Sequence, residues 1–118
     1  MALLPPQPIV LAGLTGNFIA CNAGGDEFVC PDDGLTLVEV VNGDSGSHNV
    51  TVKAQRAFAR QDGVGQAAIA DMVVAVAAGA RKHIGPFPAA YIRGDGKVRL
   101  EYSAVTTQTI AVLRVERP

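Results

Sequence analysis

The chain has 118 residues and a net charge of −1, with 10 Lys and Arg against 11 Asp and Glu; this suits one domain and lacks the basic excess of nucleic-acid-binding proteins. Hydrophobic residues make up 48% and charged residues 18%, which is too apolar for a disordered tail and suggests that a partner covers part of the surface. The apolar N-terminal stretch 3–14 is short, broken by prolines and not preceded by positive charge, so we expect neither a membrane span nor a signal peptide.

Residues 1–16 predict an extended N-terminal arm. Pro5, Pro6 and Pro8 fix φ and remove backbone donors, which favours a polyproline-like chain. The arm either hangs free or lies on a neighbouring subunit. The second alternative would give a dry surface to four apolar side chains: Ile9, Val10, Leu11 and Leu14.

Short strands are expected next, over 17–22 and 27–30. The segment 31–34 (PDDG) predicts a tight turn, because Pro suits an early turn position and Gly a position with positive φ. The run LTLVEVVN at 35–42 is nearly all apolar and β-branched. This pattern predicts a central strand that is buried on both faces.

A hairpin is expected in the middle of the chain. Residues 49–54 alternate between apolar and polar side chains, which is typical of a half-exposed strand. With the polar loop 43–47 before them, they predict a hairpin between 35–42 and 48–54. Residues 55–70 break the pattern and predict a long loop, with or without one turn of helix.

The C-terminal half predicts four further strands, over 71–77, 80–85, 97–103 and 109–115. Pro86 and Pro88 exclude regular strand pairing of the segment 86–88, which follows the second of these strands. Residues 88–91 can form one helical turn. The total of seven or eight short strands predicts an all-β, antiparallel sandwich, jelly-roll-like, as a single domain over 17–118. The expected core consists of Val50, Val52, Met72, Val74, Val76, Val98, Leu100, Tyr102, Ile110 and Val112.

The sequence contains no pattern that indicates catalysis, a metal site or a cofactor. His48 and His83 are the only histidines and have no metal-ligand spacing. Asp44 and His48 lie near serines, but in one polar loop, whereas catalytic triads assemble from distant elements. We therefore expect no enzyme, no metal and no cofactor. Two cysteines leave two states open, reduced thiols or a Cys21–Cys30 bridge.

The stretch 71–114 carries a resemblance. It contains DMVVAVAAGARKHIGPFP at 71–88, GDGKVRLEYSAVT at 94–106 and IAVLR at 110–114. This order resembles small phage virion proteins of the capsid decoration (cement) type, over about residues 20–115. Both cysteines and the segment after Arg56 depart from that pattern. The resemblance implies a structural protein of the head and supplies no catalytic residues.

The expected function is therefore that of a non-enzymatic phage capsid decoration protein. Its expected partners are the major capsid protein and further copies of itself, as a dimer or trimer, with no nucleic acid and no membrane. Its expected location is the capsid exterior, after synthesis in the host cytoplasm. The alternatives are a tail or head–tail joining component, or a small carbohydrate- or protein-binding module. Besides the arm, aromatic and Arg residues suit an interface, which adds Arg56, Phe58, Arg60, Phe87, Tyr91 and Arg93.

Overall fold

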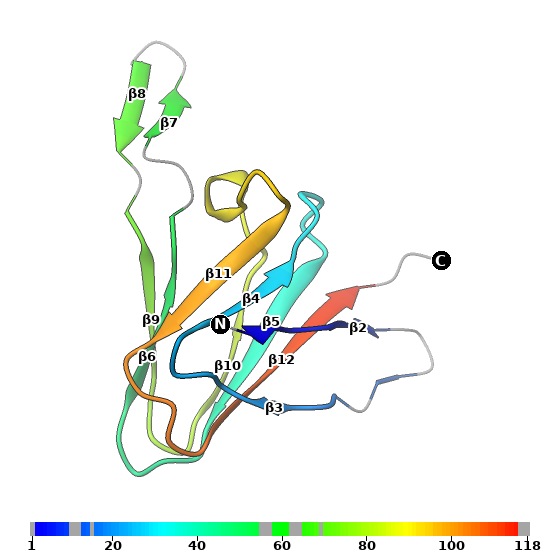
Figure 1. Cartoon of the computed structure of the whole chain (residues 1–118), viewed down its shortest axis with the longest axis vertical. Helices are drawn as coiled ribbons and strands as arrows, with labels where there is room; N and C mark the ends of the chain where they lie inside the picture. The colour runs from blue at the N-terminus through cyan, green and yellow to red at the C-terminus, as the bar shows by residue number, and fades with distance from the viewer. Residues whose placement is uncertain are drawn as a thin grey trace.

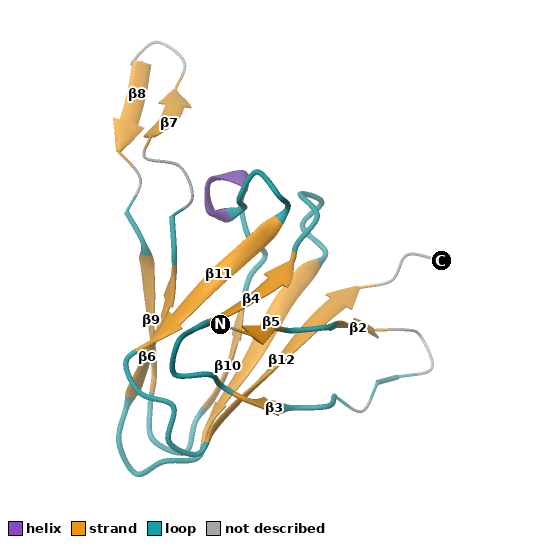
Figure 2. Cartoon of the chain, in the orientation of Figure 1, coloured by secondary structure: helices purple, strands orange, loops and turns teal. Residues whose placement is uncertain are grey.

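The chain folds as a β-sandwich, as expected from the sequence (Figure 1). A computed structural model describes residues 2–9, 13–14, 16–54, 58–61, 65–68 and 70–115. Two five-stranded sheets enclose the core, and a two-stranded hairpin projects from one end. Strands and loops account for nearly all of the described chain, and the one helical element is the 3₁₀ turn Ala89–Tyr91 (Figure 2).

The first sheet has the order β1-β4-β11-β6-β9. Its strands are β1 (Ala2–Leu3), β4 (Asp26–Val29), β11 (Lys97–Tyr102), β6 (His48–Val52) and β9 (Met72–Val76). All neighbours are antiparallel except β1, which runs parallel to β4. One edge of this sheet is therefore the very short β1, and the other is β9.

The second sheet has the order β10-β5-β12-β2. Its strands are β10 (Arg81–Ile84), β5 (Thr36–Asn42), β12 (Gln108–Val115) and β2 (Pro6–Ile9), with β3 (Ile19–Ala20) beside the first half of β12. The central position predicted for 35–42 is confirmed, because β5 pairs with both β10 and β12. Val38 and Val40 are fully buried, while Leu37 and Val41 on the other face are half-buried.

The predicted hairpin between 35–42 and 48–54 is wrong. β5 and β6 belong to different sheets, and the polar loop between them crosses from one sheet to the other. Gly43 is needed at this crossing, because its N–H donates to the Thr107 carbonyl at 2.9 Å and a Cβ would lie 3.0 Å from that oxygen. The Asn42 side chain donates to the carbonyls of Gly46 and Val76, at 2.8 and 3.0 Å, and fixes the loop to β9.

The predicted loop over 55–70 is replaced in part by strands. β7 (Phe58–Gln61) and β8 (Gly65–Ala68) pair antiparallel. They form a hairpin that continues beyond the ends of β6 and β9 (Figure 1). Small and polar residues gave this segment no apolar alternation in the sequence. The hairpin projects beyond both sheets (Figure 1).

Most of the predicted core is confirmed. Seven of its ten residues are buried between the sheets: Val50, Val52, Val76, Val98, Leu100, Ile110 and Val112. Val74 and Tyr102 pack against that cluster at its margin. Met72 is an error, since it is 49% exposed. Its side chain is on the same face of the strand as those of Val74 and Val76, which face the core. However, β9 is an edge strand and Met72 is its first residue, so no further strand of the described chain covers it.

The N-terminal arm is extended, and it is built into both sheets. β1 joins the first sheet and β2 the second, so residues 2–9 connect the two layers along one side of the sandwich. Leu4, between these strands, is 3% exposed and belongs to the core, and its N–H donates to the Glu27 carbonyl at 2.8 Å. Residues 2–9 thus contribute directly to the packing of the domain.

Candidate functional site

The described residues offer no cluster of His, Cys, Asp or Glu that could hold a metal ion. Within the same residues, no helix is long and apolar enough to cross a membrane. The two histidines lie apart. His83 is exposed on β10, whereas His48 is buried at the start of β6. The features that remain as candidate sites are a buried polar chain, a charged outer face and a cleft beside the arm.

The buried polar chain begins at His48. Its Nε2 lies 3.0 Å from Oδ2 of Asp44, and its Nδ1 lies 2.7 Å from Oε1 of Gln108. Gln108 in turn donates from Nε2 to Sγ of Cys21 at 3.4 Å. The Asp44 pKa is lowered by a hydrogen bond from the Ser45 backbone and by His48. This row of hydrogen-bonded side chains links the 43–47 loop to β12 and to the end of β3.

A second pair of polar groups continues the same layer. The Tyr102 hydroxyl donates to Oδ2 of Asp26 at 2.6 Å, and the Asn22 N–H donates to that oxygen at 3.2 Å. Asp26 is fully buried, and its Oδ1 has no partner among the described residues. Burial, with smaller contributions from Cys21 and Asp26, raises the Tyr102 pKa far above its ordinary value.

These polar groups stabilise loops and do not form a nucleophile site. Both cysteines are free and buried, so the structure has no Cys21–Cys30 bridge. Burial raises the pKa of both thiols, and a protonated, shielded thiol is a poor nucleophile. Gln108 stands between His48 and Cys21, so the imidazole does not reach the sulfur as a base would in a Cys–His pair.

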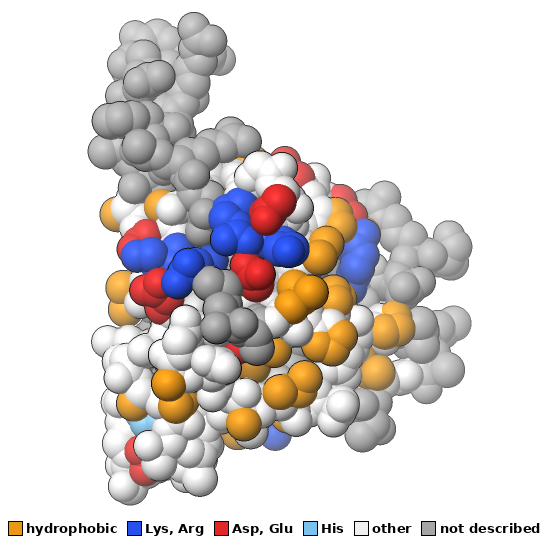
Figure 3. All heavy atoms as spheres, viewed as in Figure 1, with side chains coloured by type: hydrophobic (Ala, Val, Ile, Leu, Met, Phe, Trp, Pro, Cys, Tyr) orange, Lys and Arg blue, Asp and Glu red, His pale blue; other side chains and the backbone are white. Residues whose placement is uncertain are grey.

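The outer face of the first sheet carries alternating charges. Glu27 pairs with Arg93 and Lys97, and Glu101 pairs with Arg99 and Lys53. Figure 3 shows these blue and red side chains side by side on one face. Lys53 also lies 2.6 Å from Asp71 and lowers the pKa of that carboxyl. Because positive and negative groups neutralise each other, this face is not a basic patch of the kind that binds phosphate backbones.

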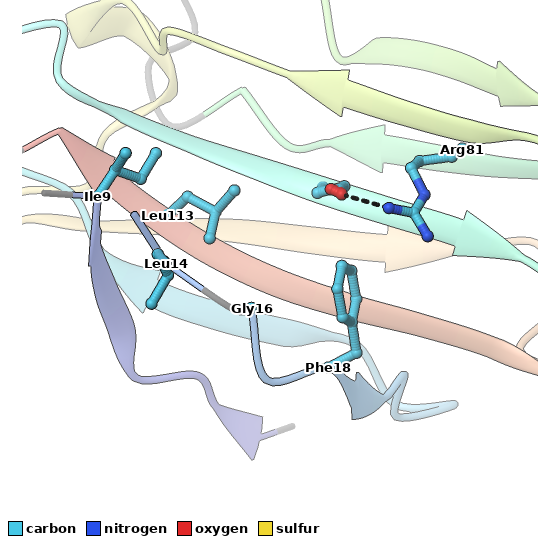
Figure 4. A pocket seen from close by; sticks show the side chains of 7 residues that line it. Ile9, Leu14, Gly16, Phe18, Arg81 and Leu113 are labelled. Atoms are coloured by element: carbon cyan, nitrogen blue, oxygen red, sulfur yellow. Dashed lines mark hydrogen bonds and ion pairs between the residues drawn. The ribbon is translucent and has the colours of Figure 1, made fainter. Parts of the chain in front are cut away.

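The outer face of the second sheet is covered in part by the arm. The Gln7 side chain forms two hydrogen bonds with the backbone of Asn17, both 2.7 Å, and these close the segment between β2 and β3. Beside that segment lies a cleft of about 270 Å³, which we call the arm cleft (Figure 4). Its lining consists of Ile9, Leu14, Gly16, Phe18, Glu39, Arg81 and Leu113.

One end of the arm cleft is apolar and the other is charged. The guanidinium carbon of Arg81 lies 5.7 Å from the centre of the Phe18 ring, a cation–π contact. Arg81 Nη1 also donates to Oε1 of Glu39 at 3.2 Å, and His83 lies 3.3 Å from Oε2. The volume is below the range usual for small-molecule sites.

The structure brings together only the arm part of the predicted interface. Ile9 and Leu14 line the arm cleft, while Val10 and Leu11 lie outside the described residues. The arm cleft also depends on residues that we did not single out, Phe18, Arg81 and Glu39. One signal in the sequence could have found them: Glu39 lies in the middle of the apolar run 35–42, and a buried charge needs a partner.

Among the other predicted interface residues, only Phe87, Tyr91 and Arg93 have side chains that the structure describes. Arg56 lies outside the described residues, and only the backbones of Phe58 and Arg60, in β7, are described. Phe87 is in the core, with its ring 5.4 Å from that of Phe28. Tyr91 packs against the core and donates to the Ala70 carbonyl, and Arg93 is bound by Glu27 and Asp95.

Comparisons with protein-family models, with curated proteins and with solved structures find no match to this chain. The resemblance to phage decoration proteins thus rests on the sequence motifs alone.

Proposed function

We propose that the protein is a non-enzymatic virion protein that docks on the outer face of a phage capsid and stabilises the head. The observation that supports this most is the arm cleft. An N-terminal segment connects both sheets and leaves an apolar, partly charged recess open on the outside of the second sheet. A capsid subunit that inserts one side chain there would be held by a domain whose two layers cannot separate without removing Leu4 from the core.

Two further features support a structural role. Apolar side chains stay exposed on the strands and arm around that side of the molecule, and exposed apolar groups in one region mark interaction surfaces. These are Leu3, Leu14, Ile19 and Val115. The charged groups of the first sheet pair with each other, so that face offers no strong net charge to a partner. A two-layer sandwich of this kind can bridge neighbouring capsid subunits without deforming.

The proposal is tested by mixing the purified protein with undecorated capsids and measuring occupancy and heat resistance. Wild type is expected to bind and to raise the temperature at which the shell opens. Leu14→Asp places a charge in the apolar part of the arm cleft and is expected to reduce occupancy at least tenfold. Val29→Asp is the matched control, because Val29 is similarly exposed, on the outer face of the other sheet, and it is expected to bind as wild type.

The outcomes separate the hypotheses. Failure of wild type to bind capsids would refute the decoration function, and binding to isolated tails or portals would favour the head–tail joining alternative. Equal losses for Leu14→Asp and Val29→Asp would show that docking does not use the arm cleft. A carbohydrate-binding role has little support, since sugar sites use exposed aromatic rings. Phe18, Tyr91 and Tyr102 are only partly exposed here.

A further inference from the structure

The outer edge of β9 has unpaired backbone groups. On β6, the Lys53 N–H and the Asn49 C=O bond to β11, so odd-numbered residues of β6 face β11 and even-numbered ones face β9. The β9 residues opposite the even positions are Met72, Val74 and Val76. By alternation, the N–H and C=O of Val73 and Ala75 point away from the sheet, and no described residue bonds to them.

The side chains at this edge are apolar and accessible. Val73 is 59% exposed, Met72 is half-exposed, and Ala75 is exposed as well. From Met72 to Ala80 the sequence MVVAVAAGA contains no charged residue. An edge of this kind, with free backbone groups and no charge, is a template for pairing with another strand.

The other edges of the sandwich are protected. β2 has Pro6 and Pro8, which lack an N–H and prevent further pairing. β10 carries Arg81, Lys82 and His83, all exposed, and charges on an edge disfavour association. β1 and β3 have two residues each. β9 is thus the exception among the edges of the two sheets.

We propose that β9 pairs with β9 of a second copy of this chain, antiparallel, about a two-fold axis at Val74. In this register Val73 lies opposite Ala75 of the other copy, so the outward backbone groups of both residues meet and form hydrogen bonds. Val74 lies opposite itself in a non-hydrogen-bonded pair. Met72 lies opposite Val76 of the other copy. Both side chains are on the inward face of the joined sheet, so the second copy covers Met72. The pairing stands whether or not the protein docks on a capsid.

A second copy suits this edge because the edge is complementary to itself. Within the described stretch 70–80, which contains β9, the one charged residue is Asp71, and it is already held by Lys53. In the proposed register it lies opposite the uncharged turn that follows β9, so no like charges meet. The β7–β8 hairpin continues beyond one end of β9 (Figure 1), and the two-fold axis sends the two hairpins in opposite directions. Two-fold dimers are also the commonest symmetric assembly.

Cysteine substitution tests the register. In a non-hydrogen-bonded antiparallel pair the Cα atoms lie about 4.5 Å apart, which is within the range of a disulfide. Val74→Cys is therefore expected to form a covalent dimer under mild oxidation of the full chain, seen on a non-reducing gel. Val73→Cys is the control and is expected to form far less, because its partner is Ala75. Native Cys21 and Cys30 are buried. Dimers from Val73→Cys but not from Val74→Cys would overturn the register.

Sedimentation velocity over a range of concentrations tests the dimer itself. Wild type is expected to form dimers, and Val73→Lys is expected to weaken the association at least tenfold by placing a charge at the seam. Leu3→Lys is the matched control, since Leu3 is 58% exposed on the opposite edge of the same sheet, and it should dimerise as wild type. Circular dichroism confirms that both variants fold. A wild type that stays monomeric at every concentration, or equal weakening by both variants, would overturn the proposal.

Discussion

The two outer faces of the sandwich are completed in different ways. On the first sheet, exposed side chains of opposite charge pair across the strands. On the second sheet, the N-terminal arm covers apolar residues and leaves Glu39, only 7% exposed, paired with Arg81 and His83. Ion pairs in water contribute little to stability, whereas buried apolar side chains contribute much more, and a buried charge that loses its partner is costly. Substitutions on the arm side are therefore expected to matter more than those in the charged face.

Leu4→Ala is expected to have the largest effect. It removes an arm side chain from the core, and buried Leu→Ala changes lower the free energy of unfolding by about 2–5 kcal/mol. Urea unfolding followed by circular dichroism measures the difference. Leu3→Ala is the control, because the neighbouring side chain is largely exposed and its loss should cost less than about 0.5 kcal/mol. Similar values for the two variants would show that the arm is not anchored through Leu4.

Arg81→Ala is expected to have an intermediate effect. It leaves the carboxylate of Glu39 with His83 as its remaining ion-pair partner and removes the contact with Phe18. A buried polar group that loses a partner costs about 1–3 kcal/mol. Lys82→Ala, the next residue on β10 and also exposed, is the control and should be nearly neutral. If the double variant Arg81→Ala, Glu39→Gln is no more stable than Arg81→Ala, the carboxylate is not the source of the cost.

The sequence predicted the fold class because β-structure leaves a local signal. The alternation in 97–103 gave the inward residues Val98, Leu100 and Tyr102, and the apolar run 35–42 gave a central strand, since a strand that is covered on both faces is apolar on both. The same run contained Glu39, a signal for a charged partner that the prediction of an apolar central strand did not use. The identity of that partner, Arg81, depends on the pairing of β5 with β10 and had no local signal.

What the sequence could not predict was the order of strands. Met72 has the inward parity of β9, but whether that position is buried depends on β9 being an edge. The hairpin expected for 35–42 and 48–54 was wrong for a similar reason, because a five-residue loop can either reverse a chain within a sheet or cross between sheets. The arm cleft formed only once the arm, β5, β10 and β12 came together from four parts of the chain.

The smallest effect on stability is expected from a substitution in the charged face of the first sheet, and this effect should depend on pH. Lys53 lowers the pKa of Asp71 below its ordinary value of 3.8, so the pair stabilises the folded state above about that pH. The contribution is lost as the pH falls through the lower pKa of the folded protein, where Asp71 becomes protonated. Asp71→Asn is therefore expected to lower the melting temperature slightly at pH 7, by less than Arg81→Ala does. The difference from wild type should shrink towards pH 3.

The response to salt distinguishes the exposed Lys53–Asp71 pair from the Arg81–Glu39 pair, in which the carboxylate is buried. Because both Lys53 and Asp71 face water, added salt screens their attraction, and the effect of Asp71→Asn should largely disappear at 1 M NaCl, where the Debye length is about 3 Å. Asp71 also accepts a hydrogen bond from the Ala54 N–H at 2.7 Å, and an Asn side chain can still accept it through its amide oxygen. The effect of Arg81→Ala should persist in salt, since Glu39 is shielded from solvent ions. An Asp71→Asn effect that resists both acid and salt would show that the two faces are stabilised by the same kind of interaction.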